Sequence, residues 1–309
     1  MFSTPFVLSF SLLFSLPLLF FFAPQILPPR QVPITLPDEI EDLSLFRRAV
    51  FSTISSQPSF SSSLYRLDPS IKLSSPGGVF EGRSIAAKRT QRASATLISA
   101  ARRLLANAIL DDPSNEFFAL VSQYCIPLHS FKFLYKSLFS TKNRVKNEHR
   151  YRSFIEILSK DPTLWKRYNA RGKNVMLPEV SFDSFRVGSQ FFVLTKKHAL
   201  IVIKDRKLWK KFKLPCIKVD SCYPEEHYFP TLLSAEDPEG CSNYTLTRVN
   251  WTDSVNGHPH LYKPPEVSPK LIFELRQSNT SFDHMFARKF SPDCLNPLME
   301  IADSVIFKD

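Results

Sequence analysis

The stretch Phe185–Thr231, FRVGSQFFVLTKKHALIVIKDRKLWKKFKLPCIKVDSCYPEEHYFPT, decides the fold that we expect for this chain of 309 residues. Its run Phe191–Leu194 combines aromatic and branched residues, which is typical of a buried strand. Apolar residues then recur at helical spacing from Ala199 to Phe212, while lysines fill most of the remaining positions. We therefore predict a strand followed by one helix, which ends at Pro215.

Two carboxylates follow that helix. Pro224, Glu225 and Glu226 suit the first turn of another helix, because proline tolerates that turn and carboxylates complement the helix dipole there. The pattern by itself makes Glu226 a helix-start charge. The aromatic and imidazole side chains around these residues are Tyr223, His227, Tyr228 and Phe229.

Composition restricts the class of protein. With 43% hydrophobic residues, the chain can bury a sizeable core. The 40 basic and 29 acidic residues give a net charge of +11, which fits an anionic ligand, an acidic lipid surface or nucleic acid. Because the basic residues are not interleaved with aromatic residues in a recognisable module, we expect no nucleic-acid partner.

The five cysteines contain no C-x-x-C pair, so we expect no zinc site. Their odd number leaves at least one thiol outside any intramolecular disulfide, and spacing does not determine which cysteines pair. The chain also lacks an Asp-x-Asp sequence, the pairing with which many sugar-nucleotide enzymes hold a metal ion.

The amino-terminal residues predict a membrane anchor. The run from Phe2 to Phe22 carries no charge, and as a helix it would extend about 30 Å, enough to span a bilayer. No positive residue precedes it, which favours an anchor over residues 1–23 rather than a cleaved signal peptide. Prolines make residues 24–40 an extended stem, so that residues 41–309 form the folded domain.

Other segments predict an α/β arrangement, because strands alternate with helices. Residues Tyr151–Leu158 fit either a strand or a helix. The remaining expected elements are a short helix at Glu39–Ile54, a helix opened by Ser84 with an apolar face from Leu97 to Ile109 and a stop at Asp111, a strand at Phe117–Val121 and a helix at Phe131–Phe139.

Three runs closely resemble plant members of the core-2/I-branching β-1,6-N-acetylglucosaminyltransferase family: Arg186–Phe192, Cys222–Thr231 and Phe286–Pro292. Supporting matches in the family's order are Arg102–Ala106, Ser122–Leu128, Val249–Trp251 and Gly257–Pro259. The resemblance implies an α/β domain with a GT-A-like, Rossmann-type mixed sheet flanked by helices. It also implies a single-pass type II protein of the Golgi membrane with a lumenal domain, although the first cations follow the apolar span.

The resemblance further implies transfer of N-acetylglucosamine, with inversion, from a UDP-sugar donor to a glycan hydroxyl. Glu226 matches the general base, and Lys289 matches the lysine that binds the donor diphosphate, with Arg288 and Arg276 as further donor-binding cations. Trp251 matches an acceptor-binding tryptophan, whereas by size alone it suits a core. Because fixed cations can stabilise a departing diphosphate, we expect no metal and no cofactor besides the donor.

Two alternatives remain open. Transfer of glucuronic acid to arabinogalactan fits the same residues. A noncatalytic glycan-binding or scaffold role is the second alternative, because the family's first nucleotide-binding strand is not recognisable before the remnant Leu64–Pro69. A lumenal location would make three N-glycosylation sequons meaningful, at Asn243, Asn250 and Asn279.

Overall fold

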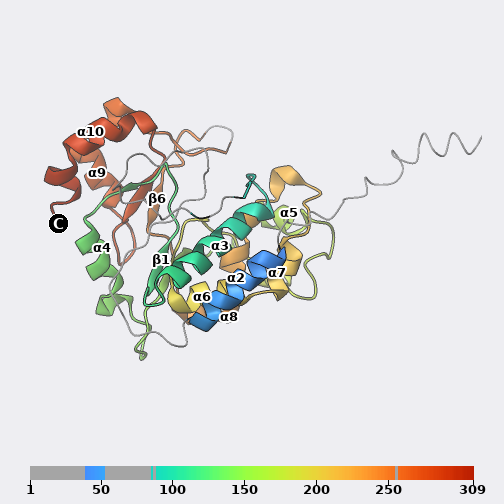
Figure 1. Ribbon diagram of the computed structural model, residues 1–309. Coiled ribbons are helices and arrows are strands. Elements are labelled where there is room, and N and C mark those ends of the chain that lie inside the picture. Colours follow the sequence, from blue (N-terminus) through green and yellow to red (C-terminus); the bar gives the residue numbers. More distant parts are fainter. Residues whose placement is uncertain (1–38, 53–84, 86–87, 255–256) are drawn as a thin grey trace, which may run out of the picture. The chain divides into compact units, whose positions relative to one another are not determined.

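A mixed α/β domain with two sheets and flanking helices is seen in the computed structural model (Figure 1). The structure describes residues 39–52, 85, 88–254 and 257–309. Three expected features lie outside these residues: the anchor at residues 1–23, nearly all of the stem, and the region 53–84, in which the family's first nucleotide-binding strand was not recognised. Within the described ranges, no helix is both long and apolar enough to cross a membrane.

The larger sheet has four strands in the order β1-β4-β3-β5. Their bounds are Phe117–Ala119 for β1, Val193–Thr195 for β4, Ser153–Glu156 for β3 and Cys241–Asn243 for β5. Strand β4 pairs antiparallel with β1 and β3, and β3 runs parallel to β5. The strands expected near Phe191 and Phe117 are thus confirmed, and the segment 151–158 contains a strand.

The smaller sheet has three strands in the order β2-β7-β6. Their bounds are Ile126–Pro127 for β2, Phe286–Arg288 for β7 and Thr247–Val249 for β6. Strand β7 is antiparallel to β2 and parallel to β6, with Val249 opposite Arg288. The expected mixed α/β architecture is thus confirmed, and its strands are divided between two sheets in the described residues.

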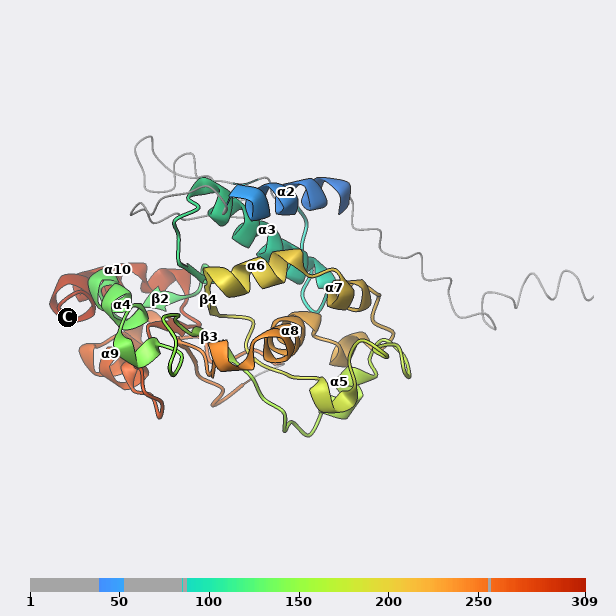
Figure 2. The same cartoon turned by 90° about the horizontal axis from the view of Figure 1, so that it is seen from below.

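Helices flank both sheets (Figures 1 and 2). Helix α6 contacts α2, α3 and α8, and α7 also contacts α8. The α-helix bounds are Glu39–Ser52 (α2), Ala95–Asp111 (α3), Phe131–Leu138 (α4), Leu164–Tyr168 (α5), Lys196–Lys204 (α6), Lys207–Phe212 (α7), Tyr228–Glu236 (α8), Pro269–Arg276 (α9) and Leu295–Glu300 (α10). The shorter 3-10 turns are Thr141–Asn143, Phe182–Ser184, Val219–Ser221, Pro224–Glu226, Pro238–Gly240, Pro264–Glu266 and Pro292–Cys294, and a π-helical turn spans Ala302–Ile306.

The helix expected from Ala199 to Phe212 is wrong as a single element, because the chain turns at Asp205 between α6 and α7. The Asp205 carboxylate accepts the backbone N–H groups of Leu208 and Trp209, at 3.0 and 2.9 Å. These bonds satisfy free donors at the start of α7. The apolar spacing continues across the turn because both helices bury side chains in the same part of the domain.

The expected start of α3 at Ser84 is also wrong. The helix begins at Ala95, and Ser94 caps it by accepting the N–H of Thr96 at 3.2 Å. Ala93, just before the cap, has a left-handed backbone with φ of 57°. Its carboxyl end at Asp111 is where the sequence predicts it.

Apolar clusters support the two sheets. One lies around the smaller sheet and includes Leu128, Ile272, Ala287 and Phe290. The other joins Phe154 of β3 and Val193 of β4 to Leu138 of α4 and to Met285, and Phe286 of β7 in the smaller sheet packs against it. This second cluster connects the sheets at the level where β7 begins.

A buried ionic cluster fixes the end of α8. Asp237 Oδ2 lies 2.6 Å from Arg150 Nη1, 2.7 Å from Lys197 Nζ and 3.1 Å from His198 Nε2. Burial opposes ionisation of this carboxyl, but the hydrogen bonds from Lys197, Arg150 and His198 prevail and hold its pKa at about 2. Asp237 is therefore an ionised anchor for α6 and for the loop that carries Arg150.

Candidate functional site

The acid turn, residues Pro224–Glu226, is a 3-10 turn rather than the first turn of an α-helix, and α8 begins after it at Tyr228. Tyr223 leads into it with a left-handed backbone. The Gly188 N–H donates to the Glu226 carbonyl oxygen at 2.9 Å. A Cβ at position 188 would lie 1.9 Å from the Glu156 carbonyl oxygen. Glycine is therefore what lets this segment approach β3 and support the acid turn.

The predicted base, Glu226, is accessible and held in place. Its Oε2 lies 2.6 Å from Nη1 of Arg167, and its side chain is 35% exposed. The Arg167 guanidinium also lies over the Tyr223 ring, 5.1 Å from its centroid. Oε1 of Glu226 makes no hydrogen bond to any residue that the structure describes. One carboxylate oxygen is thus anchored and the other is open to a hydroxyl.

Glu225 is buried, with 4% of its surface exposed. Its Oε1 accepts the backbone N–H of Ala93 at 3.1 Å, whereas its Oε2 is buried without a hydrogen-bond partner among the described residues. Burial raises the pKa of this carboxyl to about 7. Glu225 therefore links the acid turn to the turn before α3, a role that the sequence did not indicate.

His227 is a packed ring. It is fully buried and stacks on Phe185, with ring centroids 4.5 Å apart. Its Nδ1–H donates to the Arg186 carbonyl oxygen at 2.8 Å. Burial lowers its pKa to about 3, so the ring is neutral near pH 7 and is a poor proton acceptor.

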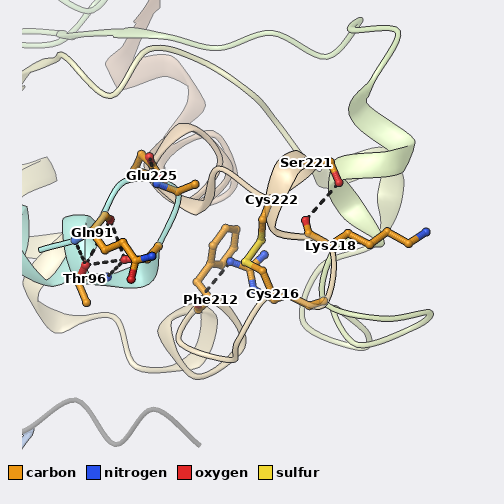
Figure 3. The surroundings of a disulfide bond; sticks show 11 residues. Gln91, Thr96, Phe212, Cys216, Lys218, Ser221, Cys222 and Glu225 are labelled. Atoms are coloured by element: carbon orange, nitrogen blue, oxygen red, sulfur yellow. Dashed lines mark hydrogen bonds between the residues drawn. A yellow bond between two sulfur atoms is a disulfide. The ribbon is translucent and has the colours of Figure 1, made fainter. Parts of the chain in front are cut away.

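A disulfide between Cys216 and Cys222 closes the link that leads to the acid turn. Figure 3 shows Glu225 on one side of this disulfide and Ser221 on the other. Sequence spacing left the pairing undetermined, and the other three cysteines are free.

Arg288 and Lys289 lie at the carboxyl end of β7. The Arg288 guanidinium is 4.2 Å from the ring centroid of Phe191, and its buried Nε has no hydrogen-bond partner in the described part of the chain. Lys289 Nζ lies 4.5 Å from the ring centroid of Tyr124. Aromatic faces thus support both cations, and neither forms an ion pair with a described carboxylate. Such cations can bind an anion.

Two further residues join these cations. Arg92 donates from Nη2 to the Gly257 carbonyl oxygen at 2.9 Å and from Nη1 to His258 Nε2 at 3.0 Å. The positive charge of Arg92 is the main cause that lowers the pKa of His258, and Lys289 and Arg288 contribute. We call Arg92, His258, Arg288 and Lys289 the cation cluster. The sequence did not indicate Arg92, because a single arginine in a loop gives no periodic signal.

Trp251 is 58% exposed, so the alternative of a core tryptophan is wrong. It lies in the loop that also carries His258. The ends of this loop are joined by the His260 N–H, which donates to the Asn250 carbonyl oxygen at 2.9 Å. An exposed indole and one member of the cation cluster are therefore presented by one loop.

Arg276 is engaged elsewhere in the described structure. At the end of α9, its Nε donates to the Leu128 carbonyl oxygen and its Nη2 to that of Val305, both at 2.8 Å. Its Nη2 is also 3.4 Å from an Asp309 carboxylate oxygen. These contacts fix the carboxyl-terminal segment, and a role in donor binding stays a prediction.

Of the three sequon asparagines, Asn243 and Asn279 are exposed and Asn250 is half-buried. The Asn250 Oδ1 accepts the Thr252 N–H at 2.9 Å, which engages this side chain within its own loop. Modification at all three positions stays a prediction.

A further carboxylate that the sequence did not single out lies near Glu226. Burial raises the pKa of Glu156, at the end of β3, and the charge of Glu226 raises it further. Its place at the end of a short strand gave no separate signal. In the described ranges, no group of three or more His, Cys, Asp or Glu residues is arranged to hold a metal ion.

Comparison with known proteins identifies the family of the chain. Residues 61–276 match the model of the family described as core-2/I-branching enzyme, a span that includes Glu226 and Trp251 and ends before the cations of β7. The chain is also 30% identical over 223 residues to the protein named Glycosyltransferase BC10 of Oryza sativa subsp. japonica. This match covers 63% of the chain and 52% of the rice protein, so the chain spans about half the length of this relative. The chain belongs to the core-2/I-branching enzyme family.

Proposed function

We propose that this protein is a glycosyltransferase that moves N-acetylglucosamine from a UDP-sugar to a glycan hydroxyl with inversion and without a metal ion. The observation that carries the proposal is the cation cluster, which is joined to the acid turn through the Ala93–Glu225 hydrogen bond. A proton acceptor and a site for a diphosphate are the two parts that this chemistry needs. The name of the rice relative supports the same class of reaction.

In the proposed reaction, Oε1 of Glu226 accepts the proton of the acceptor hydroxyl. The hydroxyl oxygen bonds to the anomeric carbon on the face opposite the diphosphate, and the bond from that carbon to the diphosphate oxygen breaks. The diphosphate leaves with the bonding electrons, which inverts the anomeric centre. Arg167 holds the other carboxylate oxygen and so limits the rotation of the base.

The charge that develops on the departing diphosphate requires fixed positive groups. Arg288 and Lys289 supply them from one end of β7, and aromatic rings hold both in position before the reaction. Preorganised cations of this kind stabilise a leaving group without reorganisation at the moment of bond cleavage. In this proposal they serve where other sugar-nucleotide enzymes use a metal ion.

Trp251 is proposed to bind the acceptor. Its exposed indole offers an apolar face, and sugar rings pack against such faces through their C–H groups. It shares a loop with His258, which would bring the acceptor close to the diphosphate site.

We further propose that the domain is lumenal in the Golgi and that residues 1–23 anchor it. The Cys216–Cys222 disulfide supports this location, because disulfides persist in oxidising compartments. The exposed sequon residues Asn243 and Asn279 also support it. Protection of the domain from protease in intact microsomes, with a mobility shift on glycosidase treatment, is expected. Complete digestion in intact microsomes would refute the location.

A transfer assay with a panel of UDP-sugars in the presence of a chelator tests the enzyme. Replacing Glu226 by Gln keeps the shape but removes the proton acceptor, so turnover should fall by about 100-fold or more while UDP still binds. Lys289→Ala should weaken UDP binding as well as turnover. Glu239→Gln, which alters an exposed carboxylate on another turn, is the control. A strict requirement for a divalent ion, or full turnover of the Glu226 variant, would contradict the mechanism.

A further inference from the structure

The turn before α3 is fixed by its own side chains. Ser94 Oγ donates to the Gln91 carbonyl oxygen at 2.8 Å, and the Gln91 N–H donates to Thr96 Oγ1 at 2.9 Å. Between these anchors, Ala93 adopts a left-handed backbone, which is uncommon for a residue other than glycine. Arg92 is exposed in this turn, next to the anchored backbone of Gln91.

The acid turn holds the same segment from the other side. Glu225 Oε1 accepts the N–H of Ala93, although Glu225 and Ala93 are 132 positions apart in the sequence. Ala93 is the residue next to Arg92. The Glu225 charge is also close enough to Arg92 for each to affect the other. The position of Arg92 is therefore tied to the residue that precedes the proposed base.

Arg92 brings to the cation cluster a charge that makes no ion pair with a described residue. Its two hydrogen-bond partners, the Gly257 carbonyl oxygen and His258 Nε2, are neutral acceptors. No described carboxylate lies within ion-pair distance of it. The chain that carries His258 runs on past the end of β7, where the Tyr262 N–H donates to the Lys289 carbonyl oxygen at 2.8 Å. The charges of Arg288 and Lys289 accordingly reach the imidazole to which Arg92 is hydrogen-bonded. Three cations with no described counter-ion form a site for a polyvalent anion.

We propose that Arg92 binds the diphosphate of the donor together with Arg288 and Lys289, and that Glu225 positions Arg92 through the Ala93 N–H. The inference rests on the proposed function. On binding, Arg92 exchanges hydrogen bonds to neutral acceptors for charge-assisted ones to phosphate oxygens, which are roughly twice as strong. Because Arg92 comes from the α3 turn and the other two cations from β7, the three can contact oxygens on different sides of the diphosphate.

Calorimetric titration of the intact chain with UDP and with uridine tests the role of Arg92, because uridine lacks the phosphates. Arg92→Gln should weaken UDP binding by about tenfold or more and leave uridine binding unchanged. Arg92→Lys, which keeps the charge without the planar fork, should give an intermediate loss. Arg89→Gln, which removes an exposed cation three residues earlier, is the matched control and should bind UDP as the wild type does.

The outcomes separate the two proposals. If Arg92→Gln binds UDP as tightly as wild type while Lys289→Ala does not, the role of Arg92 is refuted and the proposed function stands. If wild type binds neither UDP nor inorganic pyrophosphate, the proposed function fails and the inference fails with it.

The positioning role of Glu225 is tested by the same two titrations, expressed as the ratio of the affinity for UDP to the affinity for uridine. Glu225→Gln keeps an acceptor for the Ala93 N–H and should retain the ratio, whereas Glu225→Ala should lower it to the level of Arg92→Gln. Equal ratios for both Glu225 variants would refute this role, and the uridine affinity reports whether each variant is folded.

Discussion

The close approach of Gly188 to the Glu156 carbonyl group predicts how much a larger residue at position 188 would destabilise the domain. A Cβ at this position would lie 1.9 Å from the carbonyl oxygen and 2.8 Å from the carbonyl carbon of Glu156. Both atoms are backbone, so Gly188→Ala forces β3 and the segment after Val187 apart by about 1 Å in a close-packed interior. The hydrogen bond from Gly188 N–H to Glu226 is then lost or lengthened.

Two contributions set the magnitude. Overpacking costs about 1–3 kcal/mol, and a lost backbone hydrogen bond adds about 1 kcal/mol. We therefore expect Gly188→Ala to lower the free energy of unfolding by about 3 kcal/mol. For a domain of this size, that corresponds to a fall in melting temperature of roughly 6–12 °C.

Thermal unfolding followed by circular dichroism measures the effect. Gly257→Ala is the control, because Gly257, unlike Gly188, has a positive φ, 69°, and its Cβ would have no neighbour closer than 3.5 Å. That variant carries only the strain of a left-handed residue, about 1 kcal/mol. If Gly188→Ala melts no lower than Gly257→Ala, the contact between Gly188 and β3 is not as close as the structure has it.

Three other predictions concern single side chains. Arg92→Gln should raise the pKa of His258 toward 6.5, because it removes the main positive neighbour of the imidazole. An NMR titration of His258 that is unchanged in this variant would contradict the contact between Arg92 and His258. Asp237→Asn should cost about 2 kcal/mol at pH 7, since the folded pKa is depressed to about 2. That deficit should shrink as pH falls from about 4 towards 2, and urea titrations that show it constant with pH would refute the ionic origin. Trp251→Ala should raise the KM for the acceptor without lowering the melting temperature, because the indole is exposed; an unchanged KM would remove its assigned role.

Apolar patterns in the sequence predicted elements that pack against the core, and they failed where a local polar contact turns the backbone. Strand β4 and helix α4 follow their apolar patterns closely. At Asp205 the apolar spacing continues while the backbone turns, because the carboxylate caps α7 and Arg102 donates to the Asp205 carbonyl oxygen at 2.6 Å. An aspartate three residues before Leu208 was the available signal for this helix start.

The candidate site was predictable only in part, for the same reason. The motifs that carry the resemblance contain Glu226, Lys289 and Trp251, and the structure exposes the indole and leaves one oxygen of the base accessible. Arg92 was not predictable, because its position depends on a left-handed residue at Ala93 and on a hydrogen bond to Glu225 far along the chain. Contacts of such long sequence separation leave no trace in local spacing.

The Cys216–Cys222 disulfide lies just before the acid turn that carries the proposed base, and it persists only in an oxidising compartment. It spans a sequence separation of six, so it removes less freedom from the unfolded chain than a bridge across a long segment would, about 2 kcal/mol in total. The disulfide also restrains the buried Cys222, which immediately precedes the left-handed Tyr223. In a reducing environment Cys222 would lose its covalent link to Cys216, while its N–H still donates to the Val219 carbonyl oxygen and the Ala93–Glu225 hydrogen bond remains. Reduction would therefore remove one of several restraints on the segment that leads to Glu226, whose carboxylate keeps its ion pair with Arg167.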